Sequence, residues 1–488
     1  MTTHSLDFLR HAVGRSPQKT ALLSIDGTSI SYQELWKKVC LDCHWLRQQG
    51  VRSGDRVGMY FNDAIELMSL MFATWGIGAV ALPINVTLPD DKRQNIESRA
   101  KPTLGVIGSK IELASKPLFR CISYTDARTG ELSEPETAAP TDIAIIMFTS
   151  GTSGVPKAVP MSHGAIARNA LATAEELKLT AGDRILVNSP PYYTSPIIHH
   201  LTLMSKGGSV VSSEGFLFGG KLVELLEEYQ CTGFGGVPVH FTRILGAIQD
   251  QMPVPSRLRF LMNSGEHLPV PTLTAVQEAL PHIEIFCVYG LTEVAGRLCI
   301  LAPEFTQTKV GSVGFPLPGM TISIRNEEGE ELPPNERGEV FVTGPNLMSG
   351  YLDAPEINEK LMTAMGFATG DIGYKDADGF LFLDGRQDDI IKVGGEKVSI
   401  RVIEDAATGF EGLADIIVAP LYDAHLGLVP CLYYVESDTA EFKKKALRKH
   451  MKSVLPSNHV PTKYIQVESI PRNTSGKRSR KAFIASLE

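Results

Sequence analysis

The feature of this sequence that most constrains its fold is a repeated alternation of short apolar runs with helix-like segments. The apolar runs, which we interpret as buried strands, occupy residues 143–148, 185–187, 259–262 and 283–288. Helix-like segments such as 163–177 and 221–229 lie between them. Strands that alternate with helices are typical of layered α/β folds with mostly parallel strands.

The pattern changes beyond Gly311, where short alternating runs are separated by Gly, Pro and Asp. Such runs occur at 321–324, 338–343 and 379–384, and they indicate a smaller β-rich subdomain. The remainder of the chain returns to a mixed α/β pattern with a Lys-rich helix at about 441–454.

The length of 488 residues exceeds the size at which a single hydrophobic core stops growing. The turn dipeptide Asp384-Gly385 is followed by a dense cluster of charge, which we interpret as a domain boundary and a candidate hinge. We therefore predict an α/β protein with two domains. A large N-terminal domain of layered α/β sheets plus the β-rich subdomain spans residues 1–387, and a small mobile α+β C-terminal domain spans 388–488.

Composition and charge exclude several classes of protein. Hydrophobic residues at 43% and charged residues at 21% are ordinary values, so disordered, collagen-like and coiled-coil classes are excluded. The net charge of −8 gives no general attraction for nucleic acid. The basic tail of Arg478, Arg480 and Lys481 is short and lacks interleaved aromatic residues, so we expect no nucleic-acid partner.

Residues 67–84 carry no charge, and their length invites comparison with a membrane span. Gly76, Gly78 and Pro83 favour a helix, a turn and a buried strand instead. The N-terminus has charged and polar residues where a secretory signal needs an uninterrupted apolar region. We expect no membrane association and a cytoplasmic location.

Seven cysteines are scattered without a disulfide framework, which suits a reducing compartment. The segment from Cys40 to His44 matches the C-x-x-C-H string of covalent haem attachment. However, Ser31 and Glu34 form a capping box, and apolar residues follow at helical spacing, so the string lies inside a predicted helix. We interpret its cysteines as core residues.

The most informative segment is a hydroxyl-rich loop that directly follows the predicted strand at 143–148. It reads Thr149-Ser150-Gly151-Thr152-Ser153-Gly154-Val155-Pro156-Lys157. Glycines let the backbone approach a ligand closely, hydroxyl groups donate to phosphate oxygens, and Lys157 adds a cation. The loop is not a Walker A motif, because Pro156 stands where that motif needs its second glycine. A nucleotide triphosphate fits such a loop, and a flexible surface turn is the alternative interpretation.

Together with later motifs, this loop resembles the phosphate loop of the adenylate-forming superfamily, which includes acyl-CoA synthetases, adenylation domains of peptide synthetases and luciferases. The later motifs occur in the family's order at 289–293 (Tyr-Gly-Leu-Thr-Glu), 338–339 (Gly-Glu), 346–351 (Asn-Leu-Met-Ser-Gly-Tyr), 369–371 (Thr-Gly-Asp), 385–388 (Gly-Arg-Gln-Asp) and 471–477 (Pro-Arg-Asn-Thr-Ser-Gly-Lys). Any one motif is weak, but the ordered set is very specific.

The resemblance implies a nucleotide site. Tyr289 stacks on adenine, and Glu293 binds the Mg²⁺ of ATP, with Thr149 as a second implied metal ligand. Asp371 holds the ribose hydroxyls, and Arg386 reaches the nucleotide. The implied nucleotide-binding residues are Thr149, Ser150, Gly151, Thr152, Ser153, Gly154, Lys157, Gly265, Glu266, Tyr289, Gly290, Thr292, Asp371 and Arg386.

The implied reaction is an in-line attack of a substrate carboxylate on the α-phosphorus of ATP, which releases pyrophosphate. The carboxylate is already anionic, so positioning and charge neutralisation suffice. The implied catalytic residues are Lys477, Glu293, Thr149 and Lys157. Lys477 bridges the carboxylate and the α-phosphate. The C-terminal domain then rotates about Asp388, so that Lys392, Gly394 and Gly395 form a channel for a pantetheine thiol.

The resemblance also places an acyl pocket. Its implied walls are Tyr193, Val237, Pro238, Ser264, Val288, Gly290, Leu291 and Val294. They are mainly apolar, which favours an aryl or aliphatic acid. Amino-acid-activating relatives carry an Asp where this chain has Tyr193, and an unpaired buried ammonium would cost roughly 3–5 kcal/mol, so we do not expect an α-amino acid. Arg297 could meet a second carboxylate, but we favour a surface or ion-pair position for it.

Two functions remain open: an acid:CoA ligase, which we favour, and a stand-alone ligase that loads an acyl carrier protein. The predicted reactants are ATP with Mg²⁺, a small carboxylic acid, and CoA or phosphopantetheine as the acceptor. A luciferase-like oxygenase has no positive feature in this sequence. A non-catalytic nucleotide-binding paralogue is disfavoured, because Lys477, Glu293 and Asp371 are all retained.

Overall fold

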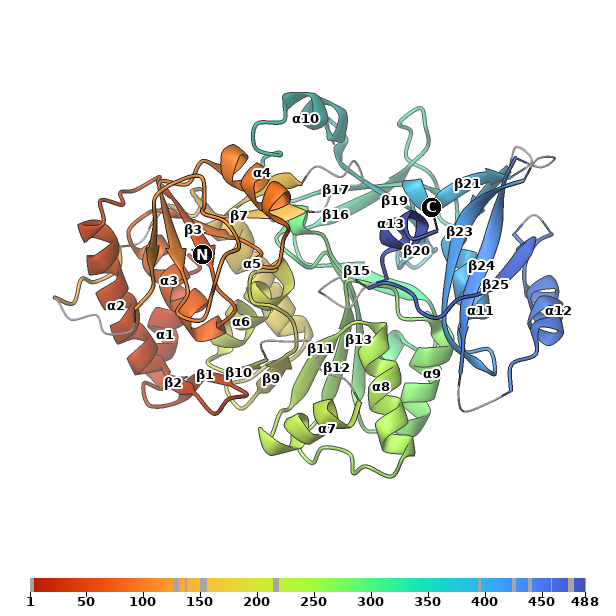
Figure 1. Ribbon diagram of the computed structural model, residues 1–488, viewed down its shortest axis with the longest axis horizontal. Coiled ribbons are helices and arrows are strands. Elements are labelled where there is room, and N and C mark those ends of the chain that lie inside the picture. The colour runs from red at the N-terminus through yellow and green to blue at the C-terminus, as the bar shows by residue number, and fades with distance from the viewer. Residues whose placement is uncertain are drawn as a thin grey trace.

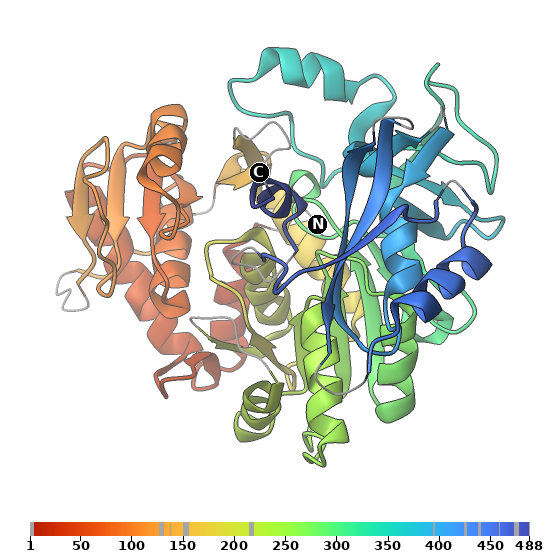
Figure 2. The same ribbon diagram turned by 45° about the vertical axis from the view of Figure 1, so that its right-hand side comes forward.

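The protein consists of layered sheets and helices with a smaller C-terminal part packed against one end (Figure 1, Figure 2). The computed structural model describes residues 4–125, 131–136, 138–149, 156–213, 219–393, 396–423, 427–437, 441–457, 459–472 and 478–487. The predicted α/β fold class is confirmed.

The first sheet has the strand order β6-β5-β3-β4-β7-β8. Its strands are β3 (Arg56–Tyr60), β4 (Val80–Pro83), β5 (Leu104–Ile107), β6 (Cys121–Ser123), β7 (Ile143–Thr149) and β8 (Lys157–Ser162). The pairs among β3 to β7 are parallel, and β8 returns antiparallel to β7. The register pairs Thr149 with Lys157, which brings the two ends of the hydroxyl-rich loop together.

The second sheet has the order β16-β17-β19-β20-β15-β14-β13-β12-β11-β9-β10-β1-β2, with β18 paired to β19. Its strands are β1 (Thr20–Ser24), β2 (Ser29–Ser31), β9 (Arg184–Val187), β10 (Ser209–Ser212), β11 (Gly233–Gly236), β12 (Phe260–Ser264), β13 (Glu284–Tyr289), β14 (Cys299–Leu301), β15 (Ser312–Pro316), β16 (Thr321–Arg325), β17 (Gly338–Thr343), β18 (Met362–Thr363), β19 (Gly366–Lys375) and β20 (Leu381–Arg386). The pairs among β9 to β13 are parallel, whereas the pair of β13 with β14 and the pairs among β14 to β20 are antiparallel. The β-rich region past Gly311 therefore continues the parallel sheet.

Helices fill the space between the two sheets. They are α1 (Asp7–Arg15), α2 (Tyr32–Gln48), α3 (Ala64–Gly76), α5 (His163–Glu176) and α6 (Thr194–Lys206). Helix α3 contacts β4 of the first sheet and β1 of the second, and each of its residues is buried. A helix that is apolar all round suits such an interior position. The uncharged segment 67–84 is thus a helix followed by β4, and no helix in the described part of the chain is long and apolar enough to cross a bilayer.

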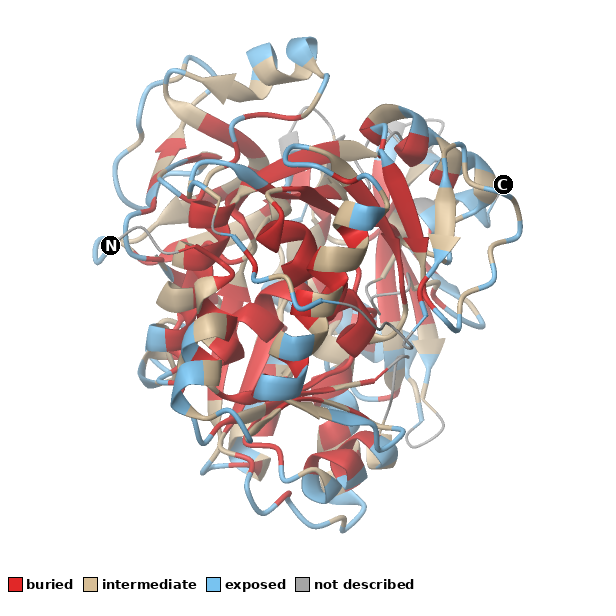
Figure 3. Cartoon of the chain, turned by 90° about the vertical axis from the view of Figure 1, so that its left-hand side faces the viewer, coloured by how far each residue is buried: buried red, intermediate tan, exposed pale blue. Residues whose placement is uncertain are grey.

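The capping box predicted for α2 is present, since Ser31 accepts from the backbone of Glu34 and Glu34 accepts from that of Ser31. Cys40 and Cys43 are both buried on this helix. The C-x-x-C-H string therefore belongs to the core, in which buried residues concentrate in the strands and the helices between them (Figure 3).

Three further helices cover the opposite face of the second sheet and enclose a separate hydrophobic cluster. They are α7 (Gly219–Glu228), α8 (Pro238–Gln249) and α9 (Val270–Ala279). Helix α4 (Asp90–Ala100) and helix α10 (Pro355–Leu361) lie at the periphery (Figure 1). The parallel strands β11, β12 and β13 end side by side at Gly236, Ser264 and Tyr289. The carboxyl ends of parallel strands are where open α/β sheets bind ligands.

The C-terminal elements share a core of their own, built around Ile403, Val418, Leu432 and Leu447. They are β21 (Ile390–Val393), β22 (Glu396–Ser399), α11 (Ile400–Ala407), β23 (Leu413–Asp423), β24 (Gly427–Glu436), α12 (Lys444–Val454), β25 (Lys463–Gln466) and α13 (Arg480–Ala485). The Lys-rich helix predicted from about 441 begins at Lys444. Among the described elements, the segment 387–389 that joins this part to β20 is a short 3-10 turn.

Candidate active site

The two described ends of the hydroxyl-rich loop face each other. Thr149 ends β7 and Lys157 begins β8, and both are half-buried. Ser150, Gly151, Thr152, Ser153 and Gly154 lie outside the described residues. The β7–β8 hairpin holds both ends of the loop near Leu352, because the Ala158 carbonyl accepts a backbone hydrogen bond of 3.0 Å from Leu352.

Tyr351 links the loop to Glu293, although the three residues lie far apart in sequence. The Tyr351 hydroxyl donates to Glu293 Oε1 at 2.7 Å, and Lys157 Nζ lies 5.0 Å from the centroid of the Tyr351 ring. The backbone of Met348 donates to the Glu293 carbonyl at 2.8 Å. Burial raises the pKa of Tyr351, and the negative charge of Glu293 raises it further, so the phenol remains a donor. This contact brings three of the sequence motifs to one place.

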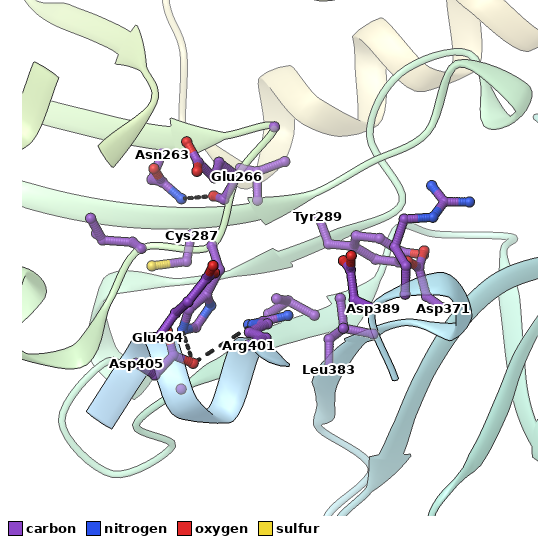
Figure 4. A pocket seen from close by; sticks show the side chains of 18 of the residues that line it. Asn263, Glu266, Cys287, Tyr289, Asp371, Leu383, Asp389, Arg401, Glu404 and Asp405 are labelled. Carbon is purple, nitrogen blue, oxygen red and sulfur yellow. Dashed lines mark hydrogen bonds and ion pairs between the residues drawn. The ribbon is translucent and has the colours of Figure 1, made fainter. Parts of the chain in front are cut away.

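A cavity of about 330 Å³ lies between the ends of β12 and β13, the β19–β20 hairpin and the C-terminal part. Of the predicted nucleotide-binding residues, those that line the cavity are Gly265, Glu266, Tyr289, Gly290, Asp371 and Arg386. Figure 4 shows Asn263 and Glu266 on one side and Tyr289, Asp371 and Asp389 on the other. Thr149, Lys157, Thr292 and Glu293 are outside this lining.

Tyr289 and Asp371 form the polar centre of the cavity. The Tyr289 hydroxyl donates to Asp371 Oδ2. Burial raises the pKa of Asp371, while the positive charge of Arg386 opposes that rise. Asp371 and Arg386 are partners in the β19–β20 register, and Arg386 also donates to the Thr369 carbonyl at 3.3 Å. A phenol, a carboxylate and a guanidinium therefore meet at one end of the cavity.

The C-terminal part closes the other side of the cavity. Arg478 Nε donates to Glu266 Oε1 at 3.1 Å, so a salt bridge joins this part to the end of β12. Arg480 pairs with Glu404 at 2.8 Å and also with Asp389. The nearby carboxylates raise the pKa of Arg478, although its burial opposes that effect. The two arginines are therefore held in ion pairs and do not form a solvated tail.

The predicted acyl-pocket residues lie around the ends of the parallel strands. Val288, Gly290 and Leu291 line the cavity, whereas Val294 is fully buried. Tyr193 precedes α6, and its hydroxyl accepts a hydrogen bond of 3.3 Å from Asn85. The remaining predicted wall residues are Val237 and Pro238 at the start of α8 and Ser264 at the end of β12.

Arg297 is not the surface or ion-pair residue that the sequence favoured. It is 4% exposed, and among the described residues neither Nη1 nor Nη2 has a hydrogen-bond partner. Asn169 of α5 holds its backbone by donating to the Arg297 carbonyl at 2.6 Å. The interpretation is wrong because spacing along the chain does not show that residues 290–298 turn back into the interior between β13 and β14.

Glu293 fits the role of a ligand to Mg²⁺. Its carboxylate is half-buried, and Oε1 accepts the hydrogen bond from Tyr351. In the described part of the chain, His, Cys, Asp and Glu do not gather in threes as a protein-only metal site. Mg²⁺ is commonly held by one or two carboxylates together with substrate phosphates and water, which such a site can provide.

Comparison with known protein families shows to which family the chain belongs. A model of the AMP-binding enzyme family matches residues 9–352, and a model of the AMP-binding enzyme C-terminal domain matches residues 402–477. The protein belongs to the AMP-binding enzyme family. The predicted membership of the adenylate-forming superfamily is thus confirmed.

Individual relatives of this AMP-binding enzyme are CoA ligases. A 2-succinylbenzoate–CoA ligase of Bacillus velezensis is 28% identical over 98% of both chains. A feruloyl-CoA synthase of Amycolatopsis sp is 28% identical over 95% of this chain and 94% of the relative. The prediction of an ATP-dependent, AMP-forming ligase of the acyl-CoA synthetase type is confirmed.

A solved relative shares the whole fold. The o-succinylbenzoate CoA synthetase of Bacillus subtilis, in complex with its acyl-adenylate intermediate, matches with a TM-score of 0.86 and 25% identity, over 98% of this chain and 97% of that one. The same enzyme in complex with ATP and a magnesium ion matches with a TM-score of 0.84 and 25% identity, over 96% and 98% of the two chains. The predicted large α/β region with a C-terminal subdomain is confirmed.

Several predicted residues of this AMP-binding enzyme cannot be placed. Lys477, Gly394 and Gly395 lie outside the described residues, and only the backbone of Asp388 and Lys392 is described.

Sequence reasoning missed two contributors to the site, Tyr351 and Arg478. Tyr351 ends the quoted 346–351 motif, and Arg478 directly follows Lys477. Their position inside family motifs was the available signal, but their partners Glu293 and Glu266 are distant in sequence.

Proposed function

We propose that the protein activates an aryl or aliphatic carboxylic acid as its acyl-adenylate and then transfers the acyl group to the thiol of CoA, in the cytosol. The observation that carries this proposal is the convergence of Lys157, Tyr351 and Glu293 beside the cavity lined by Tyr289 and Asp371. A phosphate loop, a metal-binding carboxylate and a nucleoside pocket are the three parts that adenylation needs.

The chain's residues position the reactants and neutralise their charge. Tyr289 would stack on adenine, and Asp371 would accept hydrogen bonds from the ribose hydroxyls. Thr149 and Lys157 would hold phosphate oxygens, together with the loop between them. Bound to Glu293 and the phosphates, Mg²⁺ would supply positive charge that offsets the charge of the triphosphate.

Lys477 is proposed to contact both the substrate carboxylate and the α-phosphate. A cation placed there would stabilise the charge that develops in the transition state. No general base is needed, because the attacking carboxylate is already ionised at neutral pH. The proposal keeps Asp388 as the hinge between domains 1–387 and 388–488, and Lys392, Gly394 and Gly395 as the lining of the thiol channel.

The acid is proposed to lack an α-amino group. The hydroxyl of Tyr193, a predicted pocket wall, accepts a hydrogen bond from the neutral amide of Asn85. Neither group would balance a buried ammonium. The apolar residues Val288 and Leu291 in the cavity lining suit an aryl or alkyl chain.

CoA is the favoured acceptor, because the relatives that match over nearly the whole chain carry CoA ligase names. The alternative is the phosphopantetheine arm of an acyl carrier protein, which offers the same thiol on a protein. Any difference between the two acceptors would lie beyond the thiol channel.

The test is a reaction of the purified protein with ATP, Mg²⁺ and a panel of acids, with either CoA or a phosphopantetheinylated carrier protein. AMP release together with an acyl-CoA thioester is the expected result. Formation of an acyl-carrier thioester without acyl-CoA would mean that the acceptor is the carrier protein and not CoA. Absence of AMP with every acid would overturn the proposed function.

A further inference from the structure

Arg297 is the described residue whose surroundings least match its charge. It is 4% exposed, and both terminal guanidinium nitrogens lack a hydrogen-bond partner among the described residues. Burial lowers the pKa of Arg297 to about 9, so the side chain remains positively charged at neutral pH. A buried cation without a partner is expensive, and proteins normally pair or remove such a group.

The position of Arg297 relates this charge to the proposed acyl pocket. A Cβ atom on Gly290 would lie 3.1 Å from the Arg297 Cα, so the start of Arg297 packs against the end of β13. Gly290 also lines the cavity. The backbone of Arg297 is fixed from the other side by Asn169, which donates to its carbonyl and accepts from its N–H.

The charge of Arg297 acts on His199 of α6. The charge of Arg297 contributes to lowering the pKa of His199, after the larger effect of burial, so this imidazole is neutral. The His199 ring packs against Gly235, where a Cβ atom would lie 2.7 Å from it. Gly235 stands two residues before Val237, a predicted wall of the acyl pocket. Arg297 thus begins beside Gly290 at the end of β13, and its charge acts on His199, which packs against β11.

The groups that surround Arg297 do not offset its charge. His199 is neutral, Asn169 is bound to the backbone, and burial lowers the pKa of Arg297. Val294 carries no charge, and the nearest acidic residue in the sequence, Glu293, accepts a hydrogen bond from Tyr351. In the described part of the chain, no carboxylate pairs with the Arg297 guanidinium.

We propose that Arg297 binds a second carboxylate at the far end of the substrate, so that the enzyme selects dicarboxylic acids. One carboxylate is activated by ATP and the other pairs with the guanidinium at the base of the acyl pocket. This inference rests on the proposed function, since it names the substrate class of the same site. It also reverses the interpretation that the sequence favoured for Arg297.

The test compares aliphatic and aromatic dicarboxylic acids with their half-amides, which have the same length and shape but one negative charge. The readout is kcat/KM for acid-dependent exchange of pyrophosphate into ATP. We expect the diacids to be preferred by roughly 10²-fold or more, because a half-amide leaves the buried cation unpaired. In Arg297→Met the preference should disappear, mainly through the KM of the diacid, while the KM of ATP stays unchanged.

Arg297→Lys should keep part of the preference, since it keeps the charge. Arg257→Met, at an exposed arginine, is the matched control and should behave as the wild type. Stabilisation by ATP and Mg²⁺ against heat shows that each variant is folded. If Arg297→Met does not fold, Arg297→Gln removes the charge and keeps hydrogen-bond donors.

A wild type that prefers half-amides would overturn the inference, as would an unchanged preference in the folded Met or Gln variant. Either result leaves adenylation itself intact. If none of the acids supports pyrophosphate exchange, the proposed function itself is refuted. The two failures are therefore distinguishable.

Discussion

The proposed nucleotide end and the proposed acyl end of the site differ in how their polar groups are satisfied. At the nucleotide end, Tyr289 is bound to Asp371, and Tyr351 is bound to Glu293, before any ligand arrives. At the acyl end, Arg297 is buried without a partner among the described residues. The first arrangement orients groups for a ligand that never changes. The second keeps an unpaired charge available for one class of acid, at a cost in stability.

The largest effect is expected for Lys477→Ala. Removal of a group that stabilises the transition state typically lowers kcat on the order of 10²- to 10³-fold, and ATP binding should remain. Pyrophosphate exchange measures the first quantity, and nucleotide-dependent stabilisation against heat measures the second. A variant that exchanges at the wild-type rate would remove Lys477 from the catalytic residues.

Asp371→Asn tests the preformed nucleotide end. Loss of a charged hydrogen-bond acceptor is worth about 1.5–3 kcal/mol, so the KM of ATP should rise roughly 10- to 100-fold. Because the change is isosteric and remote from the proposed acyl pocket, the KM of the acid should stay unchanged. Equal increases in both KM values would mean that the two ends are not separable.

Arg297→Met tests the cost of the unpaired charge. An apolar side chain of similar volume should stabilise the ligand-free protein by about 2 kcal/mol at neutral pH, measured by urea unfolding. Since folding lowers the pKa of Arg297 to about 9, the cost is complete below pH 9. It shrinks as the pH rises above 9 toward the ordinary value for arginine. A destabilised variant at neutral pH would indicate that the guanidinium has a partner within the protein.

The smallest effect is expected for Tyr351→Phe, which keeps the ring beneath Lys157 but removes the hydrogen bond to Glu293. At the lower end of the range for a bond to a carboxylate, about 1.5 kcal/mol, the exchange rate should fall about tenfold. The loss should be reduced at high Mg²⁺ concentration, because the hydroxyl acts by orienting Glu293. If the loss of exchange rate does not depend on the Mg²⁺ concentration, Tyr351 does not act through the metal-binding carboxylate.

Much of the fold could be predicted because its signals are local. Helix α3 and strand β4 follow from an apolar run interrupted by Gly76 and Gly78, and the start of α2 follows from the capping box at Ser31. Strand β8 was not predicted, since its residues form a strand by pairing with β7 across the loop.

The site was predictable as motifs but not as contacts. Position in a family motif predicts roles for Glu293 and Asp371, whereas the bonds from Tyr351 and from Arg478 join segments that are distant in sequence. Arg297 was misjudged for the same reason. Whether an arginine is paired, exposed or buried depends on residues such as Asn169 and His199, which only the tertiary fold brings near it.

The central claim is that the substrate carboxylate attacks the α-phosphorus of ATP. The most direct test uses an acid labelled with ¹⁸O in its carboxylate, with mass analysis of the AMP and pyrophosphate formed in the presence of CoA. The account predicts one labelled oxygen in AMP and none in pyrophosphate. Label in inorganic phosphate, with ADP as the nucleotide product, would contradict it.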